Sequence, residues 1–341
     1  MDSLTQIVLG AAVGELVLGK KLGNKAILLG AVAGTLPDLD VVTSFWNSDA
    51  VYRLKMHRAY SHAVFTHLLA SIPLAWLSVK LSRPDRETRF SVWYLFWFLG
   101  LFTHALLDCC TTYGTRLFLP FTDYQVAFNN ISVVDPLYTL PFMIFIITAM
   151  LFPRENNARS GLTWVGVGIS SAYMLLTVGL KYGAHDTFHN SLPGHVKYNP
   201  KLELNSSPTI LNSVLWAGIA TTPDSLYVAE YSYLNRGIPV KWIAYPRHLE
   251  LLSNVDCEDV KTLIWFADGQ FFVEKDSAEN LSFYTVKFGR ANFGETEASE
   301  AFLFYFNVQI NNDNYKVIAN EPKMDGKMGD AFSQLKNRIG I

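Results

Sequence analysis

Long hydrophobic runs fill the first half of the chain and are missing from the second. Six of them precede residue 182. Four are close to the roughly 20 residues that cross the hydrocarbon core of a bilayer. These four are His62–Val79, Phe90–Leu107, Pro136–Phe152 and Leu162–Leu180. We therefore predict a multi-span α-helical membrane domain over residues 1–182.

The first two runs differ from the others. Ile7–Gly19 and Ala26–Leu36 are shorter and rich in Gly and Ala. Small residues let two helices approach closely, so we predict a tight helical hairpin packed among the longer spans. The pattern leaves open whether both members of the hairpin cross the membrane.

Past Tyr182 the pattern changes to short runs of aromatic and β-branched residues separated by turns, as in β-strands. Asp268-Gly269 is typical of a hairpin turn, and residues 246–260 could hold a short helix. We predict a soluble α+β or mostly-β domain over residues 183–341, long enough for a core of its own. The expected strands are Val214–Ala220, Leu226–Tyr231, Thr262–Ala267, Gln270–Glu274, Phe283–Phe288, Phe302–Gln309 and Tyr315–Ile318.

Basic residues between the runs indicate an orientation. If all six runs cross, the three basic clusters share one face, which the positive-inside rule makes cytoplasmic. The opposite, extracytoplasmic face then carries residues 37–61, residues 108–135 and everything after Leu180. The clusters are Lys20, Lys21 and Lys25; Lys80, Arg83, Arg86 and Arg89; and Arg154 and Arg159.

Composition narrows the classes of function. Half of the 341 residues are hydrophobic, and the formal net charge is −2. Without a basic block, nucleic acid is not an expected partner. Three cysteines do not make a disulfide framework, and we interpret the adjacent Cys109 and Cys110 as small apolar residues at a helix end. No basic stretch or cleavage site surrounds the first run, so we expect it to be retained rather than removed as a signal peptide.

Seven aspartate and histidine residues lie at the predicted extracytoplasmic ends of the apolar segments. They are Asp38, Asp40, His57, His62, His104, Asp108 and Asp135. Ionisable groups at membrane depth are costly unless they pair with one another or face water. A divalent cation such as Zn²⁺, or Mn²⁺ or Fe²⁺, would supply the missing partner. His104 and Asp108 lie one helical turn apart, and a cation would relieve the repulsion between Asp38 and Asp40. We predict a site for one or two ions, with the ligands Asp38, Asp40, His57, His62, His104 and Asp108.

Several of these polar residues also have plainer interpretations. Asp135 precedes Pro136 and could simply cap the fifth helix. His67 is better explained as a packed or supporting histidine, and Glu15 as the partner of a nearby lysine, Lys20 or Lys21. Three later histidines fit a solvated linker better than a second metal site. They are His185, His189 and His195.

Four ordered motifs within residues 1–180 resemble the LexA-regulated, inner-membrane metal-dependent hydrolases of the YdjM type. The resemblance implies a bacterial inner-membrane protein and a hydrolase with phospholipids as a candidate substrate class. It carries the six residues named above over as ligands. The family often has His where this chain has Gln6, so no N-terminal ligand carries over. The motifs are Met1-Asp2-Ser3-Leu4-Thr5-Gln6, Gly34-Thr35-Leu36-Pro37-Asp38-Leu39-Asp40, His57-Arg58-x-x-Ser61-His62 and Thr103-His104-Ala105-Leu106-Leu107-Asp108, extended by Tyr113-Gly114-Thr115 and Asp135-Pro136-Leu137-Tyr138.

The first hypothesis for function is a membrane-bound hydrolase in which a metal-activated water attacks a phosphoester or related bond of a lipid or lipid-linked substrate. Asp135 would position that water or act as general base, and Arg58, with Arg116, would hold an anionic headgroup. A metal or anion transporter is one alternative. The other is a non-enzymatic membrane anchor in which the cluster is a structural metal site.

Overall fold

The computed structural model describes residues 1–47, 49–82, 88–253, 255–275, 280–290, 302–311, 314–320 and 328–340. Arg83 and Arg86, from one predicted basic cluster, lie outside the described residues. The chain forms two compact units. The first comprises residues 1–46, 56–178 and 210–212, and the second comprises residues 47–55, 179–209 and 213–341.

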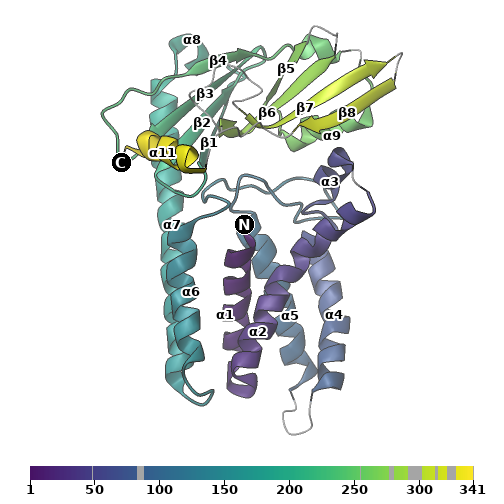
Figure 1. The fold of residues 1–341 in the computed structure, drawn as a ribbon, viewed down its shortest axis with the longest axis vertical. Helices are drawn as coiled ribbons and strands as arrows, with labels where there is room; N and C mark the ends of the chain where they lie inside the picture. Colours follow the sequence, from purple (N-terminus) through teal and green to yellow (C-terminus); the bar gives the residue numbers. More distant parts are fainter. Residues whose placement is uncertain are drawn as a thin grey trace. The chain divides into compact units, whose positions relative to one another are not determined.

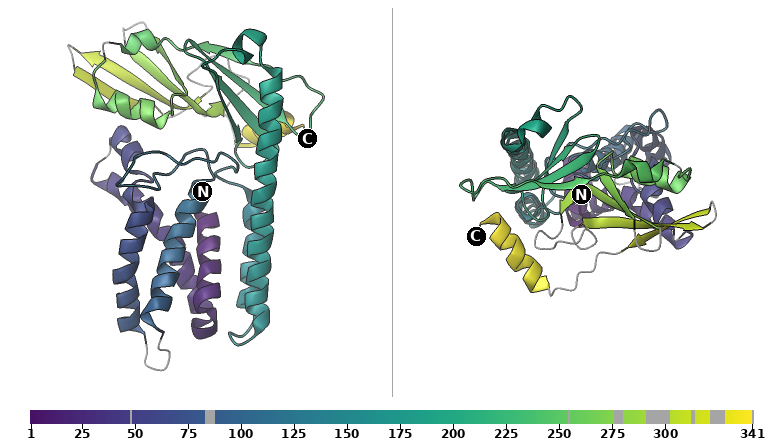
Figure 2. Two further views of the ribbon diagram at one scale, coloured as in Figure 1. Left: turned by 180° about the vertical axis from the view of Figure 1, so that it is seen from behind. Right: turned by 90° about the horizontal axis from the view of Figure 1, so that it is seen from above.

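The first unit is a bundle of apolar helices, in which α5 packs against α1, α2 and α4 (Figures 1 and 2). Within the described residues, four helices, α1, α4, α5 and α7, are long and apolar enough to cross a membrane, and α6 is a shorter apolar helix. The predicted helical membrane region is therefore confirmed. The helices are α1 (Ser3–Leu22), α2 (Asn24–Thr35), α4 (Val64–Leu81), α5 (Phe90–Asp108), α6 (Pro136–Met150) and α7 (Asn157–Ser191).

Helices α1 and α2 form the predicted tight hairpin. Gly10 and Gly14 of α1 meet Gly30 and Gly34 of α2 backbone to backbone. A methyl group at Gly10 would collide with the carbonyl oxygen of Gly30, and one at Gly30 would collide with that of Gly10. Glycine is required here because only its missing side chain allows this approach. The contact fixes the end of α2, from which the first site residues follow.

Short irregular segments join the helices at the end of the bundle that bears the candidate ligands. Two 3-10 helices, η1 (Leu36–Phe45) and η2 (Tyr60–His62), follow α2 and precede α4. The loop 109–135 folds back over the end of α5, where the Phe128 N–H donates to the carbonyl oxygen of Cys109 (2.6 Å). It also holds the start of α4, because the Val64 N–H donates to the Leu117 carbonyl oxygen (3.0 Å).

The second unit contains two four-stranded antiparallel sheets, in the orders β1-β2-β3-β4 and β5-β6-β7-β8. The predicted α+β or mostly-β character is confirmed. The strands are β1 (Glu203–Pro208), β2 (Leu215–Thr221), β3 (Ser225–Ser232), β4 (Ile243–Pro246), β5 (Phe271–Lys275), β6 (Leu281–Arg290), β7 (Phe302–Asn311) and β8 (Asn314–Asn320). The helices are α3 (Ala50–Met56, all but its last residue), the C-terminal end of α7, α8 (Gly194–Lys197), η4 (Leu249–Leu252), α9 (Glu258–Phe266) and α11 (Met328–Ile339).

Two sequence predictions in this unit are wrong. Thr262–Ala267 is not a strand but belongs mostly to α9, which buries Val260, Leu263 and Phe266. That spacing of three places the side chains on one helical face, and it outweighs the β-preference of the individual residues. Asp268 and Gly269 do form a turn, with φ of 51° and 72°, but it joins α9 to β5 and not two strands.

A buried ion pair joins helices of the first unit at the end opposite to η1 and η2. The Arg159 guanidinium donates to both carboxylate oxygens of Glu15, at 2.8 and 2.7 Å. Its remaining nitrogen Nη1 donates to Asn24 Oδ1 (2.7 Å) and to the Phe152 carbonyl oxygen (2.9 Å). Glu15 therefore pairs with an arginine 144 residues away, and not with Lys20 or Lys21 as predicted.

We predict that Arg159→Ala strongly destabilises the bundle. It leaves the Glu15 carboxylate buried without a counter-charge, a loss that typically costs about 3–5 kcal/mol. Denaturation in detergent, followed by circular dichroism, measures the effect. Arg154→Ala is the matched control, because Arg154 pairs with Glu155 on the exposed surface and such pairs contribute little. Equal losses of stability in the two variants would contradict this account.

Candidate metal centre

The candidate centre is built from three segments of the first unit. Asp38 lies in η1 directly after α2, His62 ends η2, and His104 and Asp108 occupy the last turn of α5. The i, i+4 spacing on α5 turns His104 and Asp108 to the same side, as predicted. Three of the four side chains are fully buried, and only Asp38 is partly exposed, at 25%.

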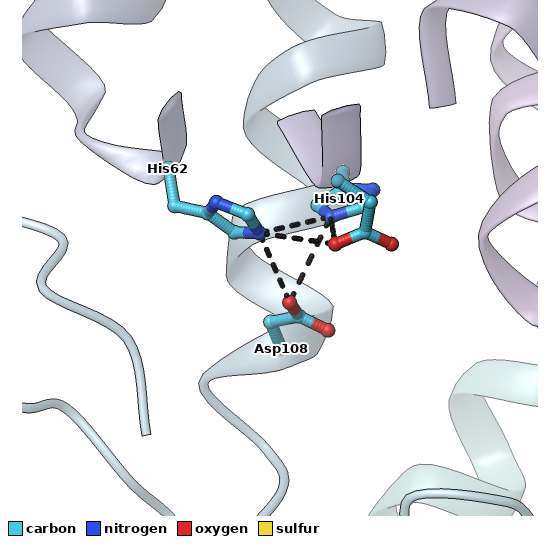
Figure 3. Close-up of side chains that lie close together, drawn as sticks. His62, His104 and Asp108 are labelled. Atoms are coloured by element: carbon cyan, nitrogen blue, oxygen red, sulfur yellow. Dashed lines mark hydrogen bonds and ion pairs between the residues drawn. The ribbon is translucent and has the colours of Figure 1, made fainter. Parts of the chain in front are cut away.

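One ligand atom of each of these four side chains converges on a common point. Figure 3 shows three of them, His62, His104 and Asp108, turned toward one another. The Nε2 atoms of His62 and His104 lie 3.1 Å apart. Asp38 Oδ1 lies 3.5 and 3.4 Å from these two nitrogens, and Asp108 Oδ2 lies 3.2 and 3.7 Å from them. All four atoms lie within 4.8 Å of one another.

These separations suit a tetrahedral metal ion. Zinc binds imidazole nitrogen and carboxylate oxygen at about 2.0–2.2 Å, and a regular tetrahedron with such bonds has edges of about 3.3–3.6 Å. The five measured separations scatter around that length. Two nitrogens and two oxygens are also a donor set that Mn²⁺ and Fe²⁺ accept. Five of the six separations therefore suit a first-row divalent ion.

The second nitrogen of each imidazole has a hydrogen-bonding partner. His104 Nδ1 lies 2.6 Å from the carbonyl oxygen of Gly34, which can only accept a hydrogen bond, so Nδ1 carries the proton. His62 Nδ1 lies 2.9 Å from the hydroxyl oxygen of Ser61. Partners of this kind orient histidine ligands in metal sites.

His62 and Asp38, which lie outside the spanning helices, have the ionisation states that metal ligands need. Burial lowers the pKa of His62 to about 3, against the opposing contact with Asp38, so the imidazole is neutral at neutral pH. Burial alone would raise the pKa of Asp38, but its contacts with His104 and His62 outweigh this and hold the pKa well below the ordinary value. Neutral imidazole and ionised carboxylate are the ligating forms.

Asp108 is held by residues from elsewhere in the bundle. The Arg58 guanidinium Nε lies 3.0 Å from its Oδ2, and Gln6 Nε2 donates to its Oδ1 (2.9 Å). The Met1 backbone nitrogen also contacts Oδ1. This role of Gln6 was not predicted from the sequence. The sequence offers one indication of it, because Gln6 is a polar residue directly before the first apolar run.

Asp40 and His57 form a pair beside the four converging atoms. His57 Nδ1 lies 3.1 Å from Asp40 Oδ1. Asp40 Oδ2 accepts from the Arg58 backbone N–H (2.8 Å) and from the Ser61 hydroxyl (3.1 Å). Burial would raise the pKa of Asp40, but the contact with His57 and the hydrogen bond from the Arg58 backbone N–H outweigh it and lower the pKa. Direct ligation by Asp40 and His57 stays a prediction.

The two residues assigned to catalysis have structural partners. The Arg58 guanidinium is buried, donates from Nη1 to Thr111 Oγ1 (3.0 Å) and lies over the Tyr113 ring, 4.9 Å from its centroid. Asp135 caps α6 by accepting from the backbone N–H groups of Leu137 and Tyr138. The capping interpretation of Asp135 is therefore confirmed, while the catalytic roles of both residues stay predictions.

The remaining polar residues fall outside the converging set. His67 is buried, with Nε2 2.8 Å from the Ser61 carbonyl oxygen, and supports the site residues through the backbone as predicted. Arg116 is buried, and its backbone N–H donates to the Arg58 carbonyl oxygen. His185 Nδ1 contacts the Ser206 hydroxyl (3.2 Å). Across the described ranges, no group of three or more such side chains other than Asp38, His62, His104 and Asp108 is close enough to hold a metal.

Comparison with known proteins places the first half of the chain in a family. Neither the curated proteins nor the solved structures contain a match. The sequence model of the YdjM inner membrane protein family matches residues 1–184, which include all four converging side chains and more than half of the chain. With apolar helices of membrane-crossing length and this match, the chain belongs to the YdjM inner membrane protein family.

Proposed function

We propose that this protein is a membrane-bound, metal-dependent hydrolase that cleaves a phosphoester or related bond in a lipid or lipid-linked substrate. The observation that carries the proposal is the convergence of four ligand atoms from Asp38, His62, His104 and Asp108 at one end of an apolar bundle. Zinc fits the donor set and the separations best, and manganese or iron are the alternatives.

A bound divalent ion would supply Lewis acidity and would lower the pKa of a coordinated water to near neutrality. The chain's own residues hold and tune that ion. Arg58 places its guanidinium 3.0 Å from Asp108 and so holds this carboxylate in position. His62 and His104 direct their Nε2 atoms to the position of the ion. Asp135 remains the candidate for general base and Arg58 for contact with an anionic headgroup, as the sequence suggested.

The accessible side of the centre supports a lipid substrate. Asp38 is the only partly exposed member of the four, so substrate would approach beside it. Its neighbours in η1, Leu39 and Val41, are apolar and more than half exposed. An apolar rim next to a polar centre suits a molecule with an acyl chain and a charged headgroup.

A structural metal site is the second candidate, and one observation favours it. Four protein ligands would complete a tetrahedron, whereas catalytic zinc sites keep a position open for water. Asp38, the exposed member, is the ligand that would have to yield, or the coordination would have to expand to five. A transporter has less support. Glu15, an ionisable residue inside α1 that could line a pathway, forms an ion pair with Arg159.

We predict that the detergent-purified protein binds a divalent metal ion and hydrolyses phospholipid or a related phosphoester. His104→Ala should weaken metal binding beyond the about 10- to 100-fold that loss of an outer partner costs, and should abolish hydrolysis. His185→Ala is the control, since it removes an imidazole of the second unit that contacts Ser206 and lies outside the converging set. Metal content, chelator competition and product release are the measurements.

Two outcomes would count against the hydrolase. Bound metal that is lost in His104→Ala, without turnover of any lipid or phosphoester in the wild type, would favour the structural site. Equal metal binding by His104→Ala and the wild type would reject the centre altogether.

We further propose that the centre and the C-terminal domain face the extracytoplasmic side, on the basis of the basic clusters. A phosphatase reporter fused after Ile341 should be active, and a fluorescent protein fused there through the general secretion route should be dark. Fusions after Glu155, in the α6–α7 connection, should show the opposite pattern. The reverse result at both positions would overturn the orientation.

A further inference from the structure

The positions of the four ligand atoms do not determine which ring nitrogen of His62 carries the proton. A histidine ligand must present an unprotonated nitrogen to the metal, and the partner of its other nitrogen decides which one that is. For His104 the partner is a backbone carbonyl oxygen, which fixes the choice. For His62 the partner is the Ser61 hydroxyl, which can either donate or accept.

Asp40 resolves this ambiguity. Its Oδ2 accepts from two directions, from the Arg58 backbone N–H at 2.8 Å and from Ser61 Oγ at 3.1 Å. A carboxylate oxygen in this position acts as an acceptor, so the single hydroxyl proton of Ser61 points to Asp40. Ser61 Oγ can then only accept from His62, which places the imidazole proton on Nδ1.

We propose that Ser61 is a positioning residue for the metal centre: held by Asp40, its hydroxyl fixes the His62 tautomer with Nε2 free to bind the ion. The inference rests on the proposed metal-dependent function and deepens it. It also gives Asp40 a role outside the ligand set, as the anchor of a carboxylate–serine–histidine relay.

The geometry supports a relay through the hydroxyl over direct contact. Asp40 Oδ2 lies 3.8 Å from His62 Nδ1, which is too long for a hydrogen bond. Ser61 Oγ is within hydrogen-bonding distance of both atoms, 3.1 Å from Asp40 Oδ2 and 2.9 Å from His62 Nδ1. Ser61 and His62 are neighbours in η2, so the short 3-10 turn sets the position of the hydroxyl relative to the ring.

The relay matters because His62 has competing acceptors on its other side. Asp108 Oδ2 and Asp38 Oδ1 lie 3.2 and 3.5 Å from His62 Nε2. Without the Ser61 acceptor at Nδ1, a proton on Nε2 directed at either carboxylate would be the favoured state. That proton would have to be displaced before an ion could bind, so affinity would fall.

The test uses the full chain in detergent and measures Zn²⁺ affinity by chelator competition and the visible spectrum of bound Co²⁺. Ser61→Ala should bind about 10- to 100-fold more weakly than the wild type, with an altered Co²⁺ spectrum, and Ser61→Thr should restore both. Ser71→Ala is the matched control, because Ser71 is a buried serine whose hydroxyl bonds only to the His67 carbonyl oxygen among its described contacts. It should bind like the wild type.

The alternatives give different results. Unchanged affinity in Ser61→Ala, or failure of Ser61→Thr to restore it, overturns the relay while the metal centre stands. A wild type with two ions and an Asp40→Asn variant with one would make Asp40 a ligand and overturn its role as anchor. A wild type that binds no ion rejects the proposed function itself, and the relay with it.

Discussion

The carboxylate of Asp108 is the charge on which the candidate centre depends. It is fully buried at the end of a helix long enough to span a membrane, where an unpaired charge would be prohibitive. Arg58, Gln6 and the two imidazoles surround it, and they come from three separate parts of the chain. Pairing this one group therefore fixes the end of α5 against α1 and against the segment before α4.

Buried charged groups have different kinds of partner at the two ends of the bundle. Glu15 and Arg159 form a bidentate ion pair, and the remaining guanidinium nitrogen, Nη1, donates to Asn24. Each charge therefore has a partner within the protein. At the other end, two imidazole nitrogens and two carboxylates turn toward one another. Such a group of acceptors is stable only with a cation or protons among them. That contrast separates a structural ion pair between helices from a candidate metal centre.

Much of this organisation is predictable from the sequence, because it depends on periodicity. The apolar runs predict the spans, the glycines predict the α1–α2 contact, and the i, i+4 spacing predicts that His104 and Asp108 share a face. The partner of Glu15 is not predictable in this way, since Arg159 is distant in sequence and closer lysines are available. The division between the converging residues and the pair Asp40–His57 depends on exact side-chain positions, which no spacing rule resolves. Thr262–Ala267 was mistaken for a strand because a short apolar run fits either period.

The central claim is that two histidines and two aspartates of the helical unit bind one divalent ion. X-ray absorption at the metal edge of the purified full-length protein tests it most directly. The account predicts a first shell of nitrogen and oxygen only, at about 2.0–2.2 Å, with the outer-shell scattering of two imidazoles. A sulfur shell at about 2.3 Å, which would implicate cysteine, or a shell without imidazole would contradict it.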